Sequence, residues 1–457
     1  MSIGTWTWRG NHGGSERSDD MSLQGSASRE WFGRASEVLV NGVSSQFRYW
    51  GDDDTLVIER GEGGYLVDMD GNRYLDLQCG FGPIILGHGD PAVSEAVVEA
   101  AGEATSFAMT QRREIEAAEK VMGALGWPER MRFTNTGTEA TMHAIRLARG
   151  MTGRDVIIKF EGQYHGMHDY VLFSTAGGPA DGLGSRFDPN PWQSSSGIPD
   201  SIRSYIRTLP YNDLEIVERT FRNGGGDIAA VIVEPMLGNA FGIMPQDGYL
   251  EGLRRVCDEY GALLIFDEVK TGFRMGLSGA VGHFGVVPDI GTYAKAMGNG
   301  FPVAAIALGE RAVEGWRQGG IAQAGTYSGN GISTAAASAT IDRLAEGSAY
   351  AQIEVVGSRM MEGLGKVLAD AGVPGHVVGH PSMFSLFLAE ETPRDFRDAV
   401  RHDSDTYDEV VMRMIPKGVM PCPDAKEPWF LCAAQTTEDA DRAVEAFGDS
   451  LQEVLAG

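Results

Sequence analysis

Two residues whose types could do chemistry lie close together in this sequence, Asp267 and Lys295. Asp267 follows the apolar run of residues 262–266, and Lys295 stands 28 residues later, among small residues and glycines. Such a run predicts a strand buried on both faces of a parallel sheet, where ligands bind at the carboxyl ends of the strands. An acid there can pair with a pyridinium nitrogen and the lysine can form a Schiff base, which is consistent with pyridoxal phosphate (PLP). The alternative is a strand-end acid and a solvated lysine.

A second motif joins a predicted strand to the start of a helix. Residues 135–140 read Asn-Thr-Gly-Thr-Glu-Ala. The hydroxyls of Thr136 and Thr138, the glycine Gly137 and free backbone N–H groups at a helix N-terminus would form an anion site. Ordinary N-capping by Thr136 or Thr138 explains the same residues. The position after a strand favours phosphate, although the nucleotide motifs GxxxxGK[ST] and GxGxxG are absent.

A third motif, residues 160–169, also follows a predicted strand and holds Tyr164, His165 and His168. The ring of Tyr164 could stack on a ring-shaped cofactor at this edge of the sheet. The alternative is a tyrosine–histidine turn packed on the sheet. A metal site is not expected, because the two histidines have no further ligands at a fitting spacing.

Composition limits the classes of protein to which the chain can belong. Its 457 residues include 38 basic and 63 acidic side chains, so the formal net charge is −25 and neither nucleic acid nor an anionic membrane is an expected partner. No apolar run of about 18 residues predicts a membrane span, and no signal pattern is visible. The four cysteines are scattered without a CxxC pair, which predicts neither a disulfide framework nor a zinc site. A cytoplasmic location is expected.

Alternating apolar patterns predict an α/β fold, with a mainly parallel central sheet, helices on both faces and a small α+β domain. Strands of the central sheet are expected at residues 131–134, 156–160, 229–235, 262–266 and 303–308. Helices are expected before them at 92–104 and 114–123, and between them at 138–149 and 248–260. The small domain is expected to combine a β-meander at 56–76, strands at 383–388 and 429–435, and helices at 30–39, 332–345, 352–371, 406–415 and 437–454.

The expected division of the chain has four parts. Residues 1–28 are expected to form a disordered tail. Residues 29–80 are expected to form the N-terminal segment of the small domain, residues 81–335 a large PLP-binding domain, and residues 336–457 the C-terminal part of the small domain. Residues 176–200, rich in Gly, Pro and Ser, predict a long loop without regular structure, either a functional lid or a disordered segment.

Several motifs, taken in order, resemble those of the class III aminotransferases, and within that family they are most similar to glutamate-1-semialdehyde aminomutase. The resemblance extends from about residue 30 to the C-terminus. The motifs that carry it are residues 135–149, 160–166, 233–235, 266–274 and 325–330.

The resemblance implies a PLP enzyme of fold type I, a homodimer whose active sites are shared between the subunits. By position, Lys295 matches the Schiff-base lysine, Asp267 the partner of the pyridinium nitrogen and Tyr164 the aromatic residue over the ring. The phosphate ligands implied are Thr136, Gly137, Thr138 and, from the neighbouring subunit, Thr326.

The substrate residues implied differ from those of many class III aminotransferases, which hold a carboxylate with an arginine near the C-terminal strand. Residues 423–430 contain no arginine here. Instead, Ser45 and Arg48 resemble an aminomutase segment that binds the substrate carboxylate, a task for which a guanidinium is suited. An arginine stacked on the aromatic residues that follow it is the alternative. Glu427 and Phe81 also match aminomutase positions near the substrate.

Three departures from the aminomutase pattern leave the reaction open. Lys270 replaces a glutamine or methionine, residues 177–200 form a longer segment, and residues 111–113 replace a smaller loop. The expected function is amino transfer between a carboxylate-bearing amine, such as an amino acid, and a keto or aldehyde acceptor. Alternatives are the aminomutase reaction, epimerisation or decarboxylation on the same scaffold, and a PLP-fold protein without catalysis.

Overall fold

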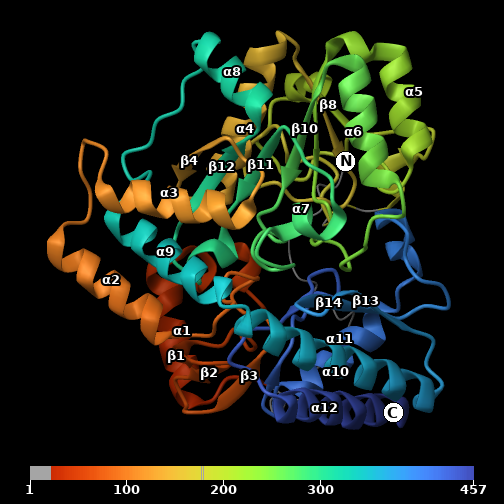
Figure 1. Cartoon of the computed structure of the whole chain (residues 1–457). Coiled ribbons are helices and arrows are strands. Elements are labelled where there is room, and N and C mark those ends of the chain that lie inside the picture. Colours follow the sequence, from red (N-terminus) through yellow and green to blue (C-terminus); the bar gives the residue numbers. More distant parts are fainter. Residues whose placement is uncertain (1–21, 177, 179) are drawn as a thin grey trace.

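The computed structural model describes residues 22–176, 178 and 180–457, and its centre is a seven-stranded sheet (Figure 1). All its strands are parallel except β12, which is antiparallel to both neighbours. This confirms the predicted mainly parallel sheet. In spatial order the strands are β4 (Arg130–Thr134), β12 (Ala304–Leu308), β11 (Ile290–Tyr293), β10 (Leu263–Asp267), β9 (Ile228–Val233), β5 (Val156–Phe160) and β8 (Ile206–Leu209).

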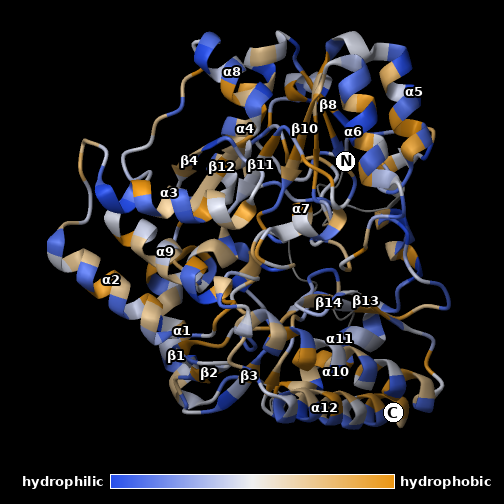
Figure 2. Ribbon diagram, in the orientation of Figure 1, coloured by the Kyte–Doolittle hydropathy of each residue, from blue (hydrophilic) through white to orange (hydrophobic). Residues whose placement is uncertain are grey.

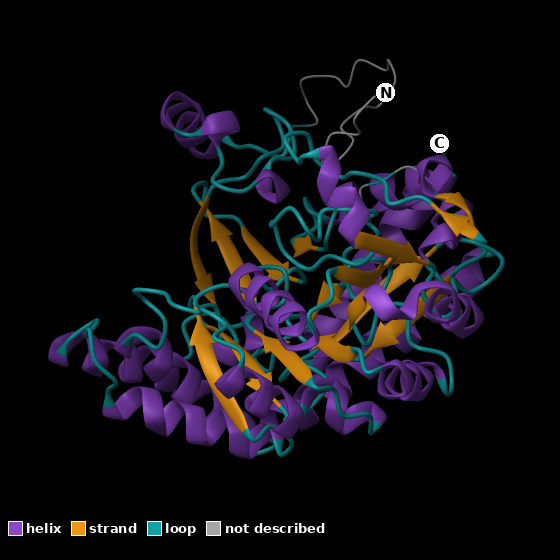
Figure 3. Cartoon of the chain, turned by 90° about the horizontal axis from the view of Figure 1, so that it is seen from above, coloured by secondary structure: helices purple, strands orange, loops and turns teal. Residues whose placement is uncertain are grey.

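The sheet is covered by helices on both faces, as the view from above shows (Figure 3). In β10, Leu264 and Phe266 belong to one apolar cluster, whereas Leu263 and Ile265 belong to the other, as the alternation of side chains along a strand requires. The strands accordingly stand out as apolar in Figure 2. One face carries α4 (Gly137–Thr152) and α8 (Glu310–Gln318), and the other α5 (Leu214–Gly224) and α6 (Tyr249–Tyr260).

Two strands of the central sheet and several helices near it were not predicted from the sequence. Strands β8 and β11 are only four residues long and contain polar residues or glycine, so neither shows a long apolar run. The unpredicted helical segments include α5, α8, α7 (Gly279–Phe284), η5 (Asp200–Tyr205), η6 (Gly225–Asp227) and η7 (Lys295–Gly298).

Two further sheets, of four and of three strands, lie beyond the central one. The predicted meander is present as β1 (Ile58–Glu62), β2 (Tyr65–Asp68) and β3 (Arg73–Asp76), and β15 (Val419–Met420) from the C-terminal part pairs in parallel with β3. The other sheet consists of β13 (His376–His380), β14 (Met383–Phe387) and β16 (Trp429–Phe430).

The predicted strand at residues 429–435 is wrong beyond Phe430. The carbonyl of Leu431 accepts a hydrogen bond from Arg274 Nη1 at 2.7 Å, and the backbone N–H of Cys432 donates to Gln435 Oε1 at 3.1 Å. Side chains therefore satisfy backbone groups that a neighbouring strand would otherwise pair.

The remaining helices surround these sheets (Figure 1). They are α1 (Ser26–Val38), η2 (Val40–Gly42), η3 (Gln46–Arg48), α2 (Pro91–Glu103), α3 (Arg112–Leu125), α9 (Gly331–Ala345), α10 (Ser348–Ala371), η8 (Phe396–Arg401), α11 (Ser404–Met414) and α12 (Thr437–Leu455). Helix α1 begins inside the range predicted as a tail, whereas residues 1–21 of that tail lie outside the described residues.

The segment predicted as a long loop contains regular structure between residues 180 and 189. It forms η4 (Ala180–Leu183) and a short hairpin of β6 (Gly184–Ser185) and β7 (Asp188–Pro189). Arg397 holds it by donating to the carbonyl of Gly184 at 2.8 Å while it forms an ion pair with Glu161 at 2.7 Å. The expectation of a structureless loop is wrong for these residues, because the arginine that secures them comes from a distant part of the sequence.

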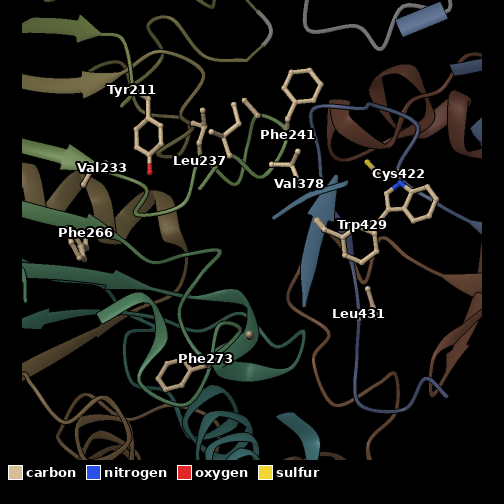
Figure 4. Packing of buried hydrophobic residues seen from close by; sticks show 14 of the residues in the cluster. Tyr211, Val233, Leu237, Phe241, Phe266, Phe273, Val378, Cys422, Trp429 and Leu431 are labelled. Atoms are coloured by element: carbon tan, nitrogen blue, oxygen red, sulfur yellow. The ribbon is translucent and has the colours of Figure 1, made fainter. Parts of the chain in front are cut away.

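The apolar core is continuous from the central sheet into the C-terminal part of the chain. Figure 4 shows Leu237 and Phe241, which follow β9, next to Val378 of β13. The ring centroids of Phe241 and Phe387 are 5.0 Å apart, edge to face. The two regions therefore pack through buried side chains. Among the described residues, no helix is both long and apolar enough to cross a membrane.

Candidate active site

The register of the sheet brings Asp267 and the lysine segment together. Asp267 is the last residue of β10, and its partner in the neighbouring strand β11 is Thr292. The hydroxyl of Thr292 donates to Asp267 Oδ1 at 3.1 Å. Three residues further, the chain reaches Lys295, the first residue of η7. Two adjacent parallel strands therefore deliver the acid and the lysine to the same edge of the sheet.

Asp267 is held on both carboxylate oxygens. Its side chain is almost completely buried; Oδ1 also accepts from the backbone N–H of Val269 at 3.1 Å, and Oδ2 lies 2.7 Å from His165 Nδ1. His165 is buried as well, and its Nε2 atom has no hydrogen-bond partner within the described part of the chain. The imidazole thus orients a buried carboxylate that can hold a proton on a ring nitrogen.

Lys295 is set apart by its backbone and its pKa. Its φ of 48° lies in the left-handed region, which a residue with a side chain adopts only when the surroundings enforce it. Burial, followed by the charge of Lys270, lowers the pKa of Lys295 to about 7, against the opposing effects of Glu427, Glu234 and Asp267. A large fraction of this amine is therefore unprotonated near neutral pH, as a nucleophile or proton acceptor needs to be.

Tyr164 lies in the segment after β5, four residues beyond its end, and a second acid, Glu234, fixes its backbone. Its N–H donates to Glu234 Oε1 at 2.8 Å, and its ring meets Phe47 edge to face with centroids 6.1 Å apart. Phe47 in turn contacts Phe81 at 6.3 Å. Burial, followed by the charges of Asp267 and Glu427, raises the pKa of Tyr164 to about 12, so the hydroxyl stays protonated.

The two histidines of this motif have separate surroundings. His165 contacts Asp267, whereas His168 Nε2 lies 3.4 Å from the hydroxyl of Thr141. Burial and the neighbouring His165 lower the pKa of His168 to about 3, so its ring is neutral. Within residues 22–176, 178 and 180–457, no group of three or more His, Cys, Asp or Glu side chains is placed to hold a metal ion.

The N-terminus of α4 lies beside the segment that follows Asp267. Thr136 is the N-cap and accepts from the backbone N–H of Glu139 at 3.1 Å, so the capping alternative is present in the structure. A Cβ atom at Gly137 would stand 3.0 Å from Val269 Cγ2, two residues after Asp267. Thr138 Oγ1 accepts from the backbone N–H of Met167 at 3.2 Å. A helix N-terminus, a buried carboxylate and a lysine of lowered pKa form a donor set that fits PLP.

Arg48 and Ser45 belong to the segment that places Phe47 against Tyr164. Arg48 is exposed at the end of η3, and its backbone N–H donates to the carbonyl of Ser45 at 3.0 Å. In the part of the chain that the structure describes, its guanidinium forms no ion pair, side-chain hydrogen bond or cation–π contact. The stacked alternative is therefore not seen, and the guanidinium is available to a ligand.

Glu427 forms an ion pair with Lys270, the lysine that departs from the aminomutase pattern. Lys270 Nζ donates to Glu427 Oε1 at 2.6 Å and to the carbonyl of Gly238 at 3.0 Å. Lys270 is therefore a buried ion-pair partner, not a free amine. Thr326, in contrast, lies exposed in the loop before α9, where its carbonyl accepts from the hydroxyl of Ser106 at 3.5 Å.

Sequence reasoning gave no roles to Glu234 or to the contact between His165 and Asp267. Glu234 follows β9, and its strand-end position is a signal that could have drawn attention to it. The histidine contact joins residues 102 positions apart, and no local pattern encodes it.

Comparisons with known proteins agree with this geometry. The family described as aminotransferase class-III matches residues 49–451. A glutamate-1-semialdehyde 2,1-aminomutase of Desulfitobacterium hafniense is 40% identical over 435 residues, which cover 94% of this chain and 99% of the relative.

Solved structures show the same architecture. An omega-transaminase from Sphaerobacter thermophilus superposes with a TM-score of 0.88 at 29% identity, covering 95% of this chain and 99% of its own. A β-phenylalanine aminotransferase from Variovorax paradoxus gives a TM-score of 0.79 at 27% identity, with 94% of each chain covered. The chain belongs to the class III aminotransferases, a family of PLP-dependent enzymes of fold type I.

Proposed function

We propose that this enzyme transfers an amino group between a carboxylate-bearing amine and a keto or aldehyde acceptor. The observation that carries the proposal is the placement of Asp267 and Lys295 at one sheet edge, with a carboxylate held by His165 and an amine whose pKa is about 7. When bound, PLP supplies an electron-accepting ring that stabilises negative charge at the substrate Cα.

Each residue of the site then has a role. Asp267 would hold the proton on the ring nitrogen, and the amine of Lys295 would carry a proton from the substrate Cα to the cofactor carbon C4′. Tyr164 covers the ring. Thr136, Gly137 and Thr138 at the N-terminus of α4 would hold the phosphate, together with Thr326 of a second copy in a homodimer. The exposure of Thr326 in the single chain is consistent with a ligand donated to a neighbour.

The substrate carboxylate is assigned to Arg48, with Ser45 beside it and Phe81 as an apolar wall. The support is a guanidinium without a protein partner in the described part of the chain, next to an aromatic series that leads to Tyr164. A planar guanidinium can donate two parallel hydrogen bonds to a carboxylate.

The second candidate is the aminomutase reaction, an amino shift within one molecule. The observation that favours it is the 40% identity to a protein named glutamate-1-semialdehyde 2,1-aminomutase over nearly its whole length. Epimerisation and decarboxylation would use the same Asp267 and Lys295.

The experiment incubates the PLP-loaded enzyme with amine donors, with and without keto or aldehyde acceptors, and follows products by chromatography. Transfer requires both partners and yields a new amine and a new carbonyl compound. Conversion of glutamate-1-semialdehyde without any acceptor would favour the aminomutase reaction instead. Release of CO₂ or loss of chirality without transfer would reject both. The Lys295→Ala variant is the control, in which no covalent PLP band and no turnover are expected, whereas Lys366→Ala, at an exposed site on α10, should behave as wild type.

A further inference from the structure

Lys270 and Glu427 form an ion pair at the edge of the proposed site. The Nζ–Oε1 distance is 2.6 Å, and the two side chains are only 4% and 18% exposed. Lys270 also donates to the carbonyl of Gly238 and lies 5.5 Å from the ring centroid of Phe430. Several contacts thus hold the ammonium of Lys270 in place, and Lys270 in turn holds the carboxylate of Glu427.

The pair is linked to the residues that bind Tyr164. A Cβ atom at Gly238 would lie 3.0 Å from Lys270 Cδ and 3.3 Å from Glu234 Oε2, so the backbone at this glycine packs against both side chains. Glu234 accepts from the N–H of Gly238 at 3.0 Å and from that of Tyr164 at 2.8 Å. Hydrogen bonds therefore connect Glu427 to Lys270, Lys270 to the carbonyl of Gly238, and the N–H groups of Gly238 and Tyr164 to Glu234.

Asp267 of β10 is in register with Thr292 of the adjacent parallel strand β11, and Lys270 and Lys295 each lie three residues beyond these paired positions, so both lysines follow strand ends at the same edge of the sheet. The charged groups that act on Lys295 come from three segments. Asp267 is the last residue of β10 and Lys270 follows it. Glu234 follows β9, and Glu427 precedes β16. Lys270 is the cation among these groups, and it lowers the pKa of Lys295, whereas the three carboxylates raise it. Like charges disfavour protonation of a neighbour, and opposite charges favour it.

We infer that Lys270 and Glu427 are a pair of positioning residues with opposite effects on Lys295. The cation of Lys270 opposes a positive charge on the Lys295 amine, whereas the carboxylate of Glu427, which Lys270 holds at 2.6 Å, favours one. The inference rests on the proposed role of Lys295. Formation of the C=N bond between lysine and PLP requires the amine lone pair, and the carbonyl oxygen leaves as water with the two amine protons.

The test uses the full-length protein from which PLP has been removed. PLP is added across a range of pH, and the rate of its covalent attachment is followed by absorbance, with borohydride trapping and peptide mass spectrometry to identify Lys295. In wild type the rate should rise with pH about a midpoint near 7. Lys270→Gln should raise the midpoint by about one unit, which lowers the rate at pH 7 by up to about tenfold. Glu427→Gln should lower the midpoint.

The opposite signs separate this role from a structural one. Lys270→Arg retains the positive charge and should keep the wild-type midpoint. Lys426→Gln is the matched control, because Lys426 directly precedes Glu427 in the sequence but its side chain faces Asp424, and this variant should also keep the wild-type midpoint. Should a single variant fail to fold because a buried partner is left unpaired, the double variant Lys270→Gln/Glu427→Gln removes both charges and should titrate between the two single variants.

Midpoints that move in the same direction, or not at all, would overturn the inference. Its failure can be told from failure of the proposed function by assaying amino transfer separately. Transfer by wild type with unmoved midpoints rejects the pair's role alone. Opposite shifts without any transfer support the pair's role and reject the proposed function alone.

Discussion

His165 Nδ1 lies 2.7 Å from Asp267 Oδ2, and both side chains are buried. The contact joins the turn after β5 to the end of β10 across the intervening strand β9. It leaves Asp267 Oδ1 to Thr292 and Val269. The carboxylate that the sequence marks as a cofactor ligand is therefore oriented by a residue from a different motif.

Removing this imidazole should weaken both the fold and the cofactor site. We expect His165→Phe to lower the free energy of unfolding by about 1.5–3 kcal/mol, the usual contribution of a hydrogen bond to a charged group, and to accelerate loss of PLP. Urea unfolding and the decay of PLP absorbance during dialysis measure the two effects. Unchanged values of both would contradict the proposed role of His165.

Asp267→Asn should leave the fold intact and reduce turnover. The amide keeps the shape of the carboxylate but cannot hold a proton on a ring nitrogen, so a loss of about 10²–10⁴ in kcat is expected, in the range of proton-transfer contributions. Steady-state kinetics with a donor–acceptor pair provide the measurement, and circular dichroism provides the control for folding. A variant with wild-type kcat would exclude the assignment.

Arg48→Ala should discriminate between substrates. Loss of a charge-assisted hydrogen bond is expected to raise KM for a carboxylate-bearing amine by about 10–100-fold, equivalent to about 1.5–3 kcal/mol. A simple amine without a carboxylate should show little change, which makes it the internal control. Equal effects on the two substrates would show that Arg48 supports the local structure and does not bind the carboxylate.

The stability of the PLP-free protein should depend on pH through Lys295. Its pKa falls from an ordinary value of 10.5 to about 7 in the folded chain. Between these values the unfolded chain binds more protons at this position, so the free energy of unfolding should rise with pH, by at most about 1.4 kcal/mol per pH unit. Below pH 7 this dependence should disappear.

Comparison with Lys295→Met isolates this contribution, because other groups titrate equally in both proteins. The variant should lose the rise between pH 7 and 10.5 that belongs to Lys295. The buried Lys159, whose pKa burial lowers to about 7, should still contribute a rise of the same sign. The free energy of unfolding is measured with urea at each pH. If it changes with pH equally in wild type and variant, Lys295 is protonated to the same extent in the folded and unfolded chains, contrary to the prediction.

Arg397→Met should release the hairpin of β6 and β7. The substitution leaves Glu161, which is 1% exposed, without its cationic partner, and breaking such a pair destabilises a fold by about 3–5 kcal/mol. We expect earlier unfolding in urea and new cleavage sites between residues 180 and 189 in limited proteolysis. The double variant with Glu161→Gln should regain part of the stability, because no buried charge remains unpaired.

Local sequence patterns carried much of the fold. The apolar runs that became β5, β9, β10 and β12 predicted the buried sheet, because strands covered on both faces must be apolar throughout. The four-residue strands β8 and β11 were missed, since each is too short and mixed to form a recognisable run. No local pattern predicted the order of the strands in the sheet or the antiparallel direction of β12.

The residue types and motif spacing by themselves determined the family, the PLP cofactor and the roles expected of Asp267 and Lys295, since these follow from chemistry at strand ends and from matched motifs. Only the tertiary structure decided that His165 holds Asp267, that Arg397 secures the hairpin after residue 180, and that Lys270 pairs with Glu427. These contacts join residues 102, 213 and 157 positions apart. They exist because packing against one sheet brings distant segments together, and no pattern within either segment encodes that distance.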